Sequence, residues 1–151
     1  CNMGYALSKG KTPQDICALN GRIVRSSSKP RRCGSLQFGA SKHIASIILA
    51  TMKTYPGHRC AMNIKYTPEN LSLIKKTAYT ISSFNRANEP EDVSSTMDWG
   101  TQTAIKKAEN CPDFIFDTGG IGKEPMIRIL GTNPKNVYEK LSTLSSLQKQ
   151  K

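Results

Sequence analysis

Short β-like runs alternate with amphipathic helical segments along this chain, and this alternation constrains its fold more than any other feature. The clearest helix is predicted over residues 39–55, where Ser41 can cap the first turn. Its apolar residues follow the i, i+3, i+4, i+8 spacing of a buried stripe, namely Ile44, Ile47, Ile48 and Met52. Pro56-Gly57 ends the helix.

Further helices are predicted where a capping residue precedes a proline, at Thr12-Pro13, Thr67-Pro68 and Asn133-Pro134. The first of these opens a short helix over residues 14–19. Another helix is expected from Trp99 or Thr101 to Glu109, and the last residues, 145–151, are expected to fray. Strands are expected at residues 3–7, 22–25, 31–33, 60–66, 78–84, 113–117 and 126–130. This order predicts a single domain in which helices cover a sheet, with either an α/β fold or a variant that has a mixed sheet and three layers.

The positive charge is concentrated in the first part of the chain. Eleven Lys and Arg residues and one acid, Asp15, lie between residues 1 and 66, whereas residues 67–151 carry eleven bases and ten acids. Such a field favours an anionic partner, and nucleic acid, an anionic membrane and a polyphosphate metabolite all fit it. No stacking platform or basic helix that would favour nucleic acid is visible.

The cysteines and histidines predict no metal site. The five cysteines form no C-x-x-C pair, and His43 and His58 do not complete a zinc-binding spacing with them. This usage is typical of reduced thiols in a cytoplasmic protein. No apolar run approaches the ~20 residues that span a bilayer. Because the chain opens on Cys1 and a β-like stretch follows at once, we expect it to be part of a longer polypeptide.

The segment over residues 117–124, DTGGIGKE, is the strongest local chemical signal. Its glycines permit positive φ angles, so that backbone N–H groups could converge on an anion beside Lys123. The same pattern is also that of a tight hairpin between two strands. It is not a Walker A loop, because Glu124 stands where that motif requires Ser or Thr. The glycines concerned are Gly119, Gly120 and Gly122.

Two basic groups elsewhere are candidates for anion binding. His43 lies just inside the start of the predicted helix 39–55, where free N–H groups and the helix dipole favour a phosphate. An ordinary surface histidine has the same pattern. Arg22 and Arg25 flank an apolar pair in a predicted strand. They either bind a ligand or are solvated arginines at the edge of the sheet.

Several acidic residues are candidates for Mg²⁺ binding or for ion pairing. Asp117, Glu124 and Asp98 could bind Mg²⁺, because hard cations take oxygen ligands and those on polyphosphates need few protein carboxylates. Arg86 and Glu89 share one polar loop, where they either pair with each other or contact a ligand.

Several motifs in order carry a resemblance to a known family, and the segment from Gly119 to Arg128 is the most specific of them. Together they resemble the ThiN-type thiamine-phosphate synthase domain over nearly the whole chain. The motifs are residues 1–7 (CNMGYAL), 21–25 (GRIVR), 38–43 (FGASKH), 62–66 (MNIKY), 84–86 (FNR) with Glu89-Pro90, Trp99-Gly100, and residues 113–117 leading into 119–128 (GGIGKEPMIR).

The resemblance implies an AraD-like three-layer α/β/α fold with a mixed central sheet, and the condensation of hydroxymethylpyrimidine diphosphate with hydroxyethylthiazole phosphate, giving thiamine phosphate and diphosphate. We expect Mg²⁺ as the cofactor and keep Asp117 as the candidate ligand. The family's essential arginine and histidine map onto Arg22 and His43. We further expect a set of residues to bind the substrates, namely Asn63, Gly119, Gly120, Gly122, Lys123, Glu124 and Arg128.

The resemblance also implies partners and one alternative. Such domains commonly form the C-terminal part of an archaeal bifunctional protein with a hydroxymethylpyrimidine (phosphate) kinase, and a homodimer is expected, with no nucleic-acid or membrane partner. Asn85 and Ser46 depart from the family pattern, which usually has Asp and Arg there. The alternative is a non-catalytic domain that senses thiamine phosphates in a regulator, although Arg22 and His43 are both present.

Overall fold

The computed structural model describes residues 1–150 and has a mixed seven-stranded sheet at its centre. The strand order is β5-β2-β1-β6-β9-β8-β7, and within it only β7 and β8 run parallel. Its strands are β1 (Asn2–Ala6), β2 (Ile16–Leu19), β5 (Leu36–Phe38), β6 (Cys60–Lys65), β7 (Ile81–Ser83), β8 (Phe114–Asp117) and β9 (Met126–Gly131).

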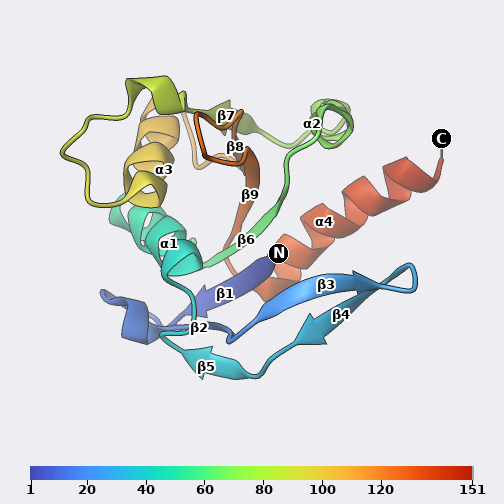
Figure 1. Ribbon diagram of the computed structural model, residues 1–151, viewed down its shortest axis with the longest axis horizontal. Helices are drawn as coiled ribbons and strands as arrows, with labels where there is room; N and C mark the ends of the chain where they lie inside the picture. The colour runs from blue at the N-terminus through green and yellow to red at the C-terminus, as the bar shows by residue number, and fades with distance from the viewer. Residues whose placement is uncertain (151) are drawn as a thin grey trace.

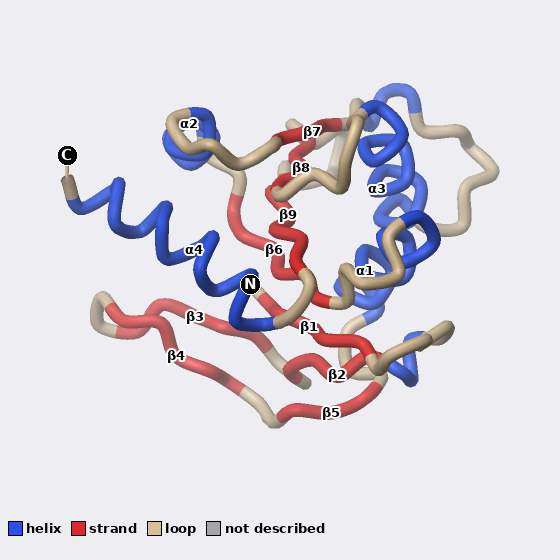
Figure 2. Tube along the Cα trace, turned by 180° about the vertical axis from the view of Figure 1, so that it is seen from behind, coloured by secondary structure: helices blue, strands red, loops and turns tan. Residues whose placement is uncertain are grey.

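Helices lie on both faces of this sheet, as the views from front and back show (Figures 1 and 2). On one face α1 (Lys42–Thr54) packs against α3 (Thr96–Lys107), and their apolar side chains share one core with Ala61, Ile115 and Leu130 of the sheet. On the other face lie α2 (Pro68–Lys75) and α4 (Pro134–Lys149), over a second core. The predicted α/β fold with three layers and a mixed sheet is therefore confirmed.

The predicted central helix is confirmed as α1, and its position follows from its apolar stripe. Ser41 caps it by accepting a hydrogen bond from the amide of Ile44 at 3.3 Å. The stripe residues are buried, and Gly4 of β1 lets the helix approach closely, because a Cβ at Gly4 would lie 2.5 Å from Ile44. Close packing against the sheet backbone fixes the position of α1. The N-terminus of α1, which lines the functional cavity, is therefore fixed as well.

The prediction of a helix over residues 14–19 was wrong. Pro13–Asp15 forms one 3-10 turn, closed by hydrogen bonds that the amide and hydroxyl of Thr12 donate to the carboxylate of Asp15, and the chain then enters β2. Ile16 is buried in the α1 core, while Cys17 pairs with Tyr5 of β1. Burial by strand pairing outweighs the helix signal of the cap and the proline, because a short isolated helix has little stability of its own.

The expectation that residues 145–151 fray was also wrong for the described part, since α4 continues to Lys149. Leu144 is buried, and Leu147 packs against the second core. The buried Lys140 ties the helix to the sheet, because its ammonium donates to the carbonyl of Leu130 at 2.5 Å and pairs with Asp113 at 2.7 Å.

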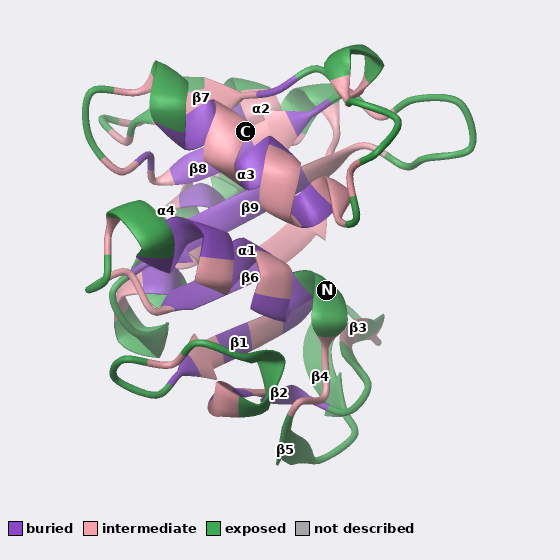
Figure 3. Cartoon of the chain, turned by 90° about the vertical axis from the view of Figure 1, so that its left-hand side faces the viewer, coloured by how far each residue is buried: buried purple, intermediate pink, exposed green. Residues whose placement is uncertain are grey.

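A separate two-stranded ribbon, β3 (Arg22–Ser26) and β4 (Lys29–Cys33), projects beside β1 and β2. It is joined to the N-terminal strand by a hydrogen bond from the amide of Ile23 to the carbonyl of Cys1 at 2.7 Å. Every residue of β4 is exposed, as its green colour in Figure 3 shows. Among the described helices, none is long and apolar enough to cross a membrane.

The glycine segment between β8 and β9 is a tight hairpin, the second of the two geometries considered for it. Gly120 and Lys123 exchange two backbone hydrogen bonds of 3.0 and 3.1 Å, and the amide of Gly119 donates to Asp117 at 2.8 Å. Gly119 and Gly122 have φ angles of 79° and 68°. Three amides of the segment, those of Gly119, Gly120 and Lys123, are thus already bonded within the protein. The hairpin holds the positions of Lys123 and Glu124, which lie at its end.

Two alanine substitutions test this hairpin. Gly119→Ala should lower the stability by about 1–2 kcal/mol, or a few degrees in Tm, because alanine is strained at positive φ. The new Cβ would also lie 2.6 Å from the carbonyl oxygen of Lys123. Gly120→Ala is the matched control, since a Cβ there touches only Arg86, at 3.7 Å. Thermal melts that give the same Tm for both variants would contradict the hairpin's dependence on Gly119.

Candidate functional site

A cavity of about 450 Å³ opens where the N-termini of α1 and α3 meet the β8–β9 hairpin. Serines and a threonine line it together with four groups that carry or can carry positive charge, and one carboxylate stands at its edge. The lining residues are Lys42, His43, Ser46, Arg86, Ser94, Ser95, Thr96, Met97, Lys123, Glu124 and Met126.

Two helix N-termini contribute to the wall of this cavity. Lys42 and His43 belong to the first turn of α1, and Thr96 and Met97 to the first turn of α3, which Ser95 caps by accepting from the amide of Asp98 at 3.2 Å. The N-terminus of a helix carries partial positive charge and free amides. Two such ends on one cavity, with cationic side chains between them, favour an anion.

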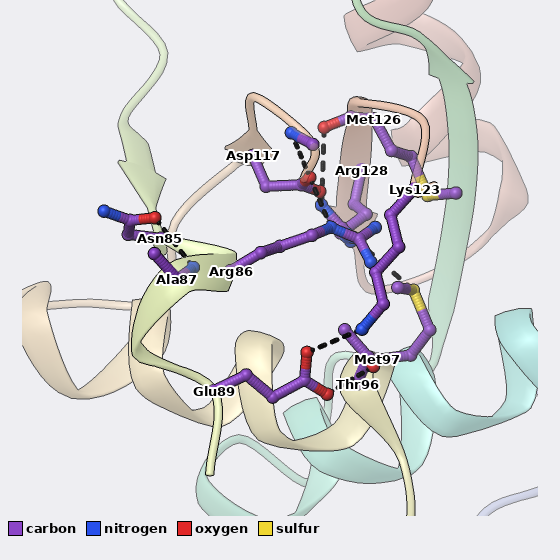
Figure 4. A network of polar contacts seen from close by, with 11 residues as sticks. Asn85, Arg86, Ala87, Glu89, Thr96, Met97, Asp117, Lys123, Met126 and Arg128 are labelled. Carbon is purple, nitrogen blue, oxygen red and sulfur yellow. Dashed lines mark hydrogen bonds and ion pairs between the residues drawn. The ribbon is translucent and has the colours of Figure 1, made fainter. Parts of the chain in front are cut away.

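Beneath the cavity, the buried carboxylate of Asp117 bonds to two arginines (Figure 4). Its Oδ1 accepts from Nε of Arg86 and its Oδ2 from Nη1 of Arg128, each at 2.7 Å. Asp117 and Arg128 have fully buried side chains, and Arg86 is only 7% exposed. Two guanidinium groups against one carboxylate leave this buried cluster with an excess of positive charge.

Arg128 is the deeper of the two arginines. Its guanidinium lies 4.8 Å from the ring centre of Phe84 and contacts the sulfur of Met97 at 3.4 Å. Burial lowers the pKa of Arg128, and the ion pair with Asp117 opposes this shift. Since it does not reach the cavity wall, Arg128 holds Asp117 in place from below instead of facing a ligand there.

Arg86 is the upper arginine, and it faces the cavity. Because its Nε is bonded to Asp117, its two Nη groups remain available, and neither has a hydrogen-bond partner within residues 1–150. It extends from the 3-10 turn η2 (Arg86–Asn88), which follows β7. A guanidinium fixed through Nε presents its outer edge as a rigid fork for phosphate oxygens.

Lys123 reaches the cavity from the glycine hairpin and is held by Glu89, with an N···O distance of 3.0 Å (Figure 4). Glu89 also accepts from the hydroxyl of Thr96, and that hydrogen bond, followed by Lys123, lowers the pKa of Glu89. The Arg86–Glu89 pair considered from the sequence is absent from the described ion pairs: Arg86 pairs with Asp117 and Glu89 with Lys123.

The structure places the site residues expected from the sequence at several different locations. His43, Lys123 and Glu124 line the cavity, and Asn63 lines a neighbouring one. The glycines shape the hairpin, and Arg128 is buried below it. Arg22 lies apart, exposed at the start of β3, next to the Ile23 amide that binds Cys1.

The same geometry tests whether a resident Mg²⁺ fits. Within the described residues no group of three or more His, Cys, Asp or Glu side chains could hold a metal ion. Both carboxylate oxygens of Asp117, the candidate ligand, are bonded to guanidinium groups. Asp98 pairs with Lys53 at 3.3 Å. This donor set does not fit a resident Mg²⁺ ion.

Sequence reasoning did not assign cavity positions to Lys42, Arg86, Ser95 and Thr96. A usable signal existed for the start of α3, because Ser95 is a capping residue directly before the helix. Arg86 could be placed only through Asp117, which is thirty-one residues further along the chain and comes beside it because β7 and β8 are parallel neighbours.

Comparison with known proteins agrees with the fold and shows the family. The family model described as thiamine-phosphate synthase ThiN matches residues 1–143. The chain is 42% identical over 147 residues to the bifunctional thiamine biosynthesis protein ThiDN of Methanocaldococcus jannaschii. That match covers 97% of this chain and 35% of ThiDN, so the chain spans about a third of that relative. It is 34% identical over 142 residues to thiamine-phosphate synthase ThiN of Methanothermobacter thermautotrophicus, covering 91% of this chain and 75% of that protein.

Solved structures give the same result. The C-terminal domain of protein MJ0236 superposes with a TM-score of 0.91 at 41% identity, covering 99% of this chain and 82% of the other. The C-terminal domain of a phosphomethylpyrimidine kinase superposes with a TM-score of 0.89 at 36% identity, covering 95% and 83%. The family model spans nearly the whole chain, and these structures share its sheet and helices. The chain therefore belongs to the ThiN family of thiamine-phosphate synthases.

Proposed function

We propose that this domain is a thiamine-phosphate synthase that joins hydroxymethylpyrimidine diphosphate to hydroxyethylthiazole phosphate and releases diphosphate. One observation carries the proposal beyond family membership. Two helix N-termini and the side chains of Lys42, His43, Arg86 and Lys123 converge on a single cavity. This is the arrangement that a diphosphate leaving group requires, since negative charge grows on it as the bond breaks.

The reaction needs no protein nucleophile. The lone pair of the thiazole nitrogen forms the new C–N bond to the pyrimidine methylene, while the C–O bond breaks and its electron pair leaves with diphosphate. In this proposal Arg86 and Lys123 stabilise the departing oxygens, and His43 donates a hydrogen bond or a proton to them. Holding both substrates in line supplies the rest of the rate enhancement.

Arg22 and Mg²⁺ enter the proposal on the family resemblance. The exposed position of Arg22 on β3 leaves its side chain free to bind phosphate. Because the protein's own carboxylates do not fit a resident metal, we place the expected Mg²⁺ on the diphosphate of the substrate and assign it no step. A fused kinase domain fits the bifunctional relative. A homodimer and a cytoplasmic location stay predictions.

A direct assay tests the proposed function. The domain, incubated with both substrates and Mg²⁺, should form thiamine phosphate and diphosphate, measured by chromatography and by release of diphosphate. If no product forms while thiamine phosphate or either substrate still binds in calorimetry, the synthase proposal fails and the sensor alternative takes its place.

His43→Ala should lower kcat by about 10²–10³ with a much smaller change in KM, the loss expected when a transition-state donor is removed. His58→Ala is the matched control, because His58 is the other histidine of the chain and does not line the cavity. Its kcat should stay within about twofold of the wild type. A His43→Ala enzyme with wild-type turnover would remove His43 from the mechanism.

Arg22→Ala should lower kcat to a similar extent if the family's essential arginine is this residue. Because Arg22 is exposed and forms no ion pair in the described structure, the substitution should leave Tm unchanged. Arg25→Ala, on the same exposed strand, is the control for a general loss of positive charge. Equal kcat values for the two variants and the wild type would contradict the role of Arg22.

A further inference from the structure

A second cavity, of about 500 Å³, adjoins the first, and the mechanism above does not use it. Glu124 and Met126 line both cavities, so the two share a wall formed by the end of the glycine hairpin. The remaining lining comes from the end of β6 and the start of the chain, namely Cys1, Asn63, Ile64, Lys65, Tyr66 and Pro125.

Both cavities open at the same end of the sheet, on the face that α1 and α3 cover. Ala61 packs in the core beneath these helices, so Asn63 and Lys65, two and four residues further along β6, face the same side. Met126 packs against the same core and is the strand partner of Lys65. The second cavity therefore continues the first one along the sheet.

The polar groups of the second cavity suit a phosphate monoester. Lys65 is exposed and has no ion-pair partner among residues 1–150. The Oδ1 of Asn63 accepts from the backbone amide of Asn2 at 2.7 Å, so its NH₂ group remains as a donor. One ammonium and one amide supply one positive charge and several N–H donors, which suits a single phosphate, whereas the first cavity carries more cationic groups.

The apolar groups of the cavity suit a ring. Pro125 and Met126 line it, and Met126 packs against the core under α1 and α3. Ile64 and Tyr66 also border the cavity, but their side chains pack against the second core on the other face of the sheet, where Tyr66 stacks on Phe116 with ring centres 6.0 Å apart. A flat heteroaromatic ring with a short phosphorylated arm would contact Pro125 and Met126 and place its phosphate at Lys65.

Glu124 stands between the two cavities and forms no ion pair within the described residues. When the thiazole nitrogen gives its lone pair to the methylene carbon, the neutral ring becomes a cation while the electrons of the C–O bond leave with diphosphate. A carboxylate at the shared wall would lie next to this developing positive charge and stabilise it.

We propose that the second cavity binds the phosphorylated thiazole, with Lys65 and Asn63 on its phosphate and Glu124 beside the nitrogen that is alkylated. This assignment rests on the proposed function and extends it, because it gives each of the two substrates its own cavity and names a residue for the charge that forms between them.

Binding by calorimetry tests the phosphate contact without requiring turnover. Lys65→Met should weaken the binding of hydroxyethylthiazole phosphate about tenfold or more, the cost of a lost charge-assisted contact, and leave the unphosphorylated thiazole alcohol unaffected. The KM for hydroxymethylpyrimidine diphosphate should not change. Lys135→Met is the control, because Lys135 is equally exposed but lies in the first turn of α4, beyond the opposite end of β9.

Turnover tests Glu124. Glu124→Gln should lower kcat about tenfold or more and leave both KM values within about twofold, since it removes a charge that acts when the cation forms. Glu139→Gln, an exposed acid on α4, should leave kcat unchanged.

The outcomes separate this inference from the proposed function. If the wild type forms thiamine phosphate but Lys65→Met binds thiazole phosphate as tightly as the wild type, the second cavity is not the thiazole site. If Lys65→Met weakens the alcohol and the phosphate equally, Lys65 does not contact the phosphate and the assignment also fails. If the wild type neither binds thiazole phosphate nor forms product, the proposed function fails and this inference with it.

Discussion

The buried carboxylate of Asp117, held between Arg86 and Arg128, is the interaction on which the site depends. A buried charge without partners is costly, so the three charged side chains stabilise one another in these positions. Arg128 is pinned from below by Phe84 and Met97, and through Asp117 it fixes Arg86 at the cavity wall. The amide of Gly119 bonds to the same carboxylate, so the hairpin that carries Lys123 and Glu124 is aligned by the same group.

The topology explains why these groups meet. The ends of β6 and β8 and the start of β9 lie at one end of the sheet, and α1 and α3 begin there on one face (Figure 1). Chain segments far apart in the sequence thus deliver cations, helix N-termini and one free carboxylate to two adjoining cavities. A reaction that separates diphosphate from a new cation is helped by positive and negative groups close together. This end of the sheet carries both, because cationic side chains line the first cavity and Glu124 lies at the wall that the two cavities share.

The sequence predicts most of the fold where the signal is local. The apolar stripe and cap of α1, the Thr67 and Asn133 starts of α2 and α4, and the runs that form β6, β8 and β9 are confirmed. The short helix expected at residues 14–19 was wrong because pairing of β2 with β1, a contact between distant segments, decides that stretch. His43, Lys123 and Glu124, which the sequence singles out, line the cavity, whereas the position of Arg86 depends on Asp117 and so could not be read from spacing. The likeness to AraD-type proteins stays a prediction.

The central claim is that Arg86, oriented by Asp117, makes the first cavity a diphosphate site. Titration of inorganic diphosphate into the wild type and into Arg86→Met, followed by calorimetry, measures this contact without any condensation step. The account predicts that Arg86→Met binds at least about thirtyfold more weakly, the loss of a charged fork of hydrogen bonds, while Arg32→Met on the exposed β4 strand binds as the wild type does. A folded Arg86→Met protein with wild-type affinity for diphosphate would contradict it.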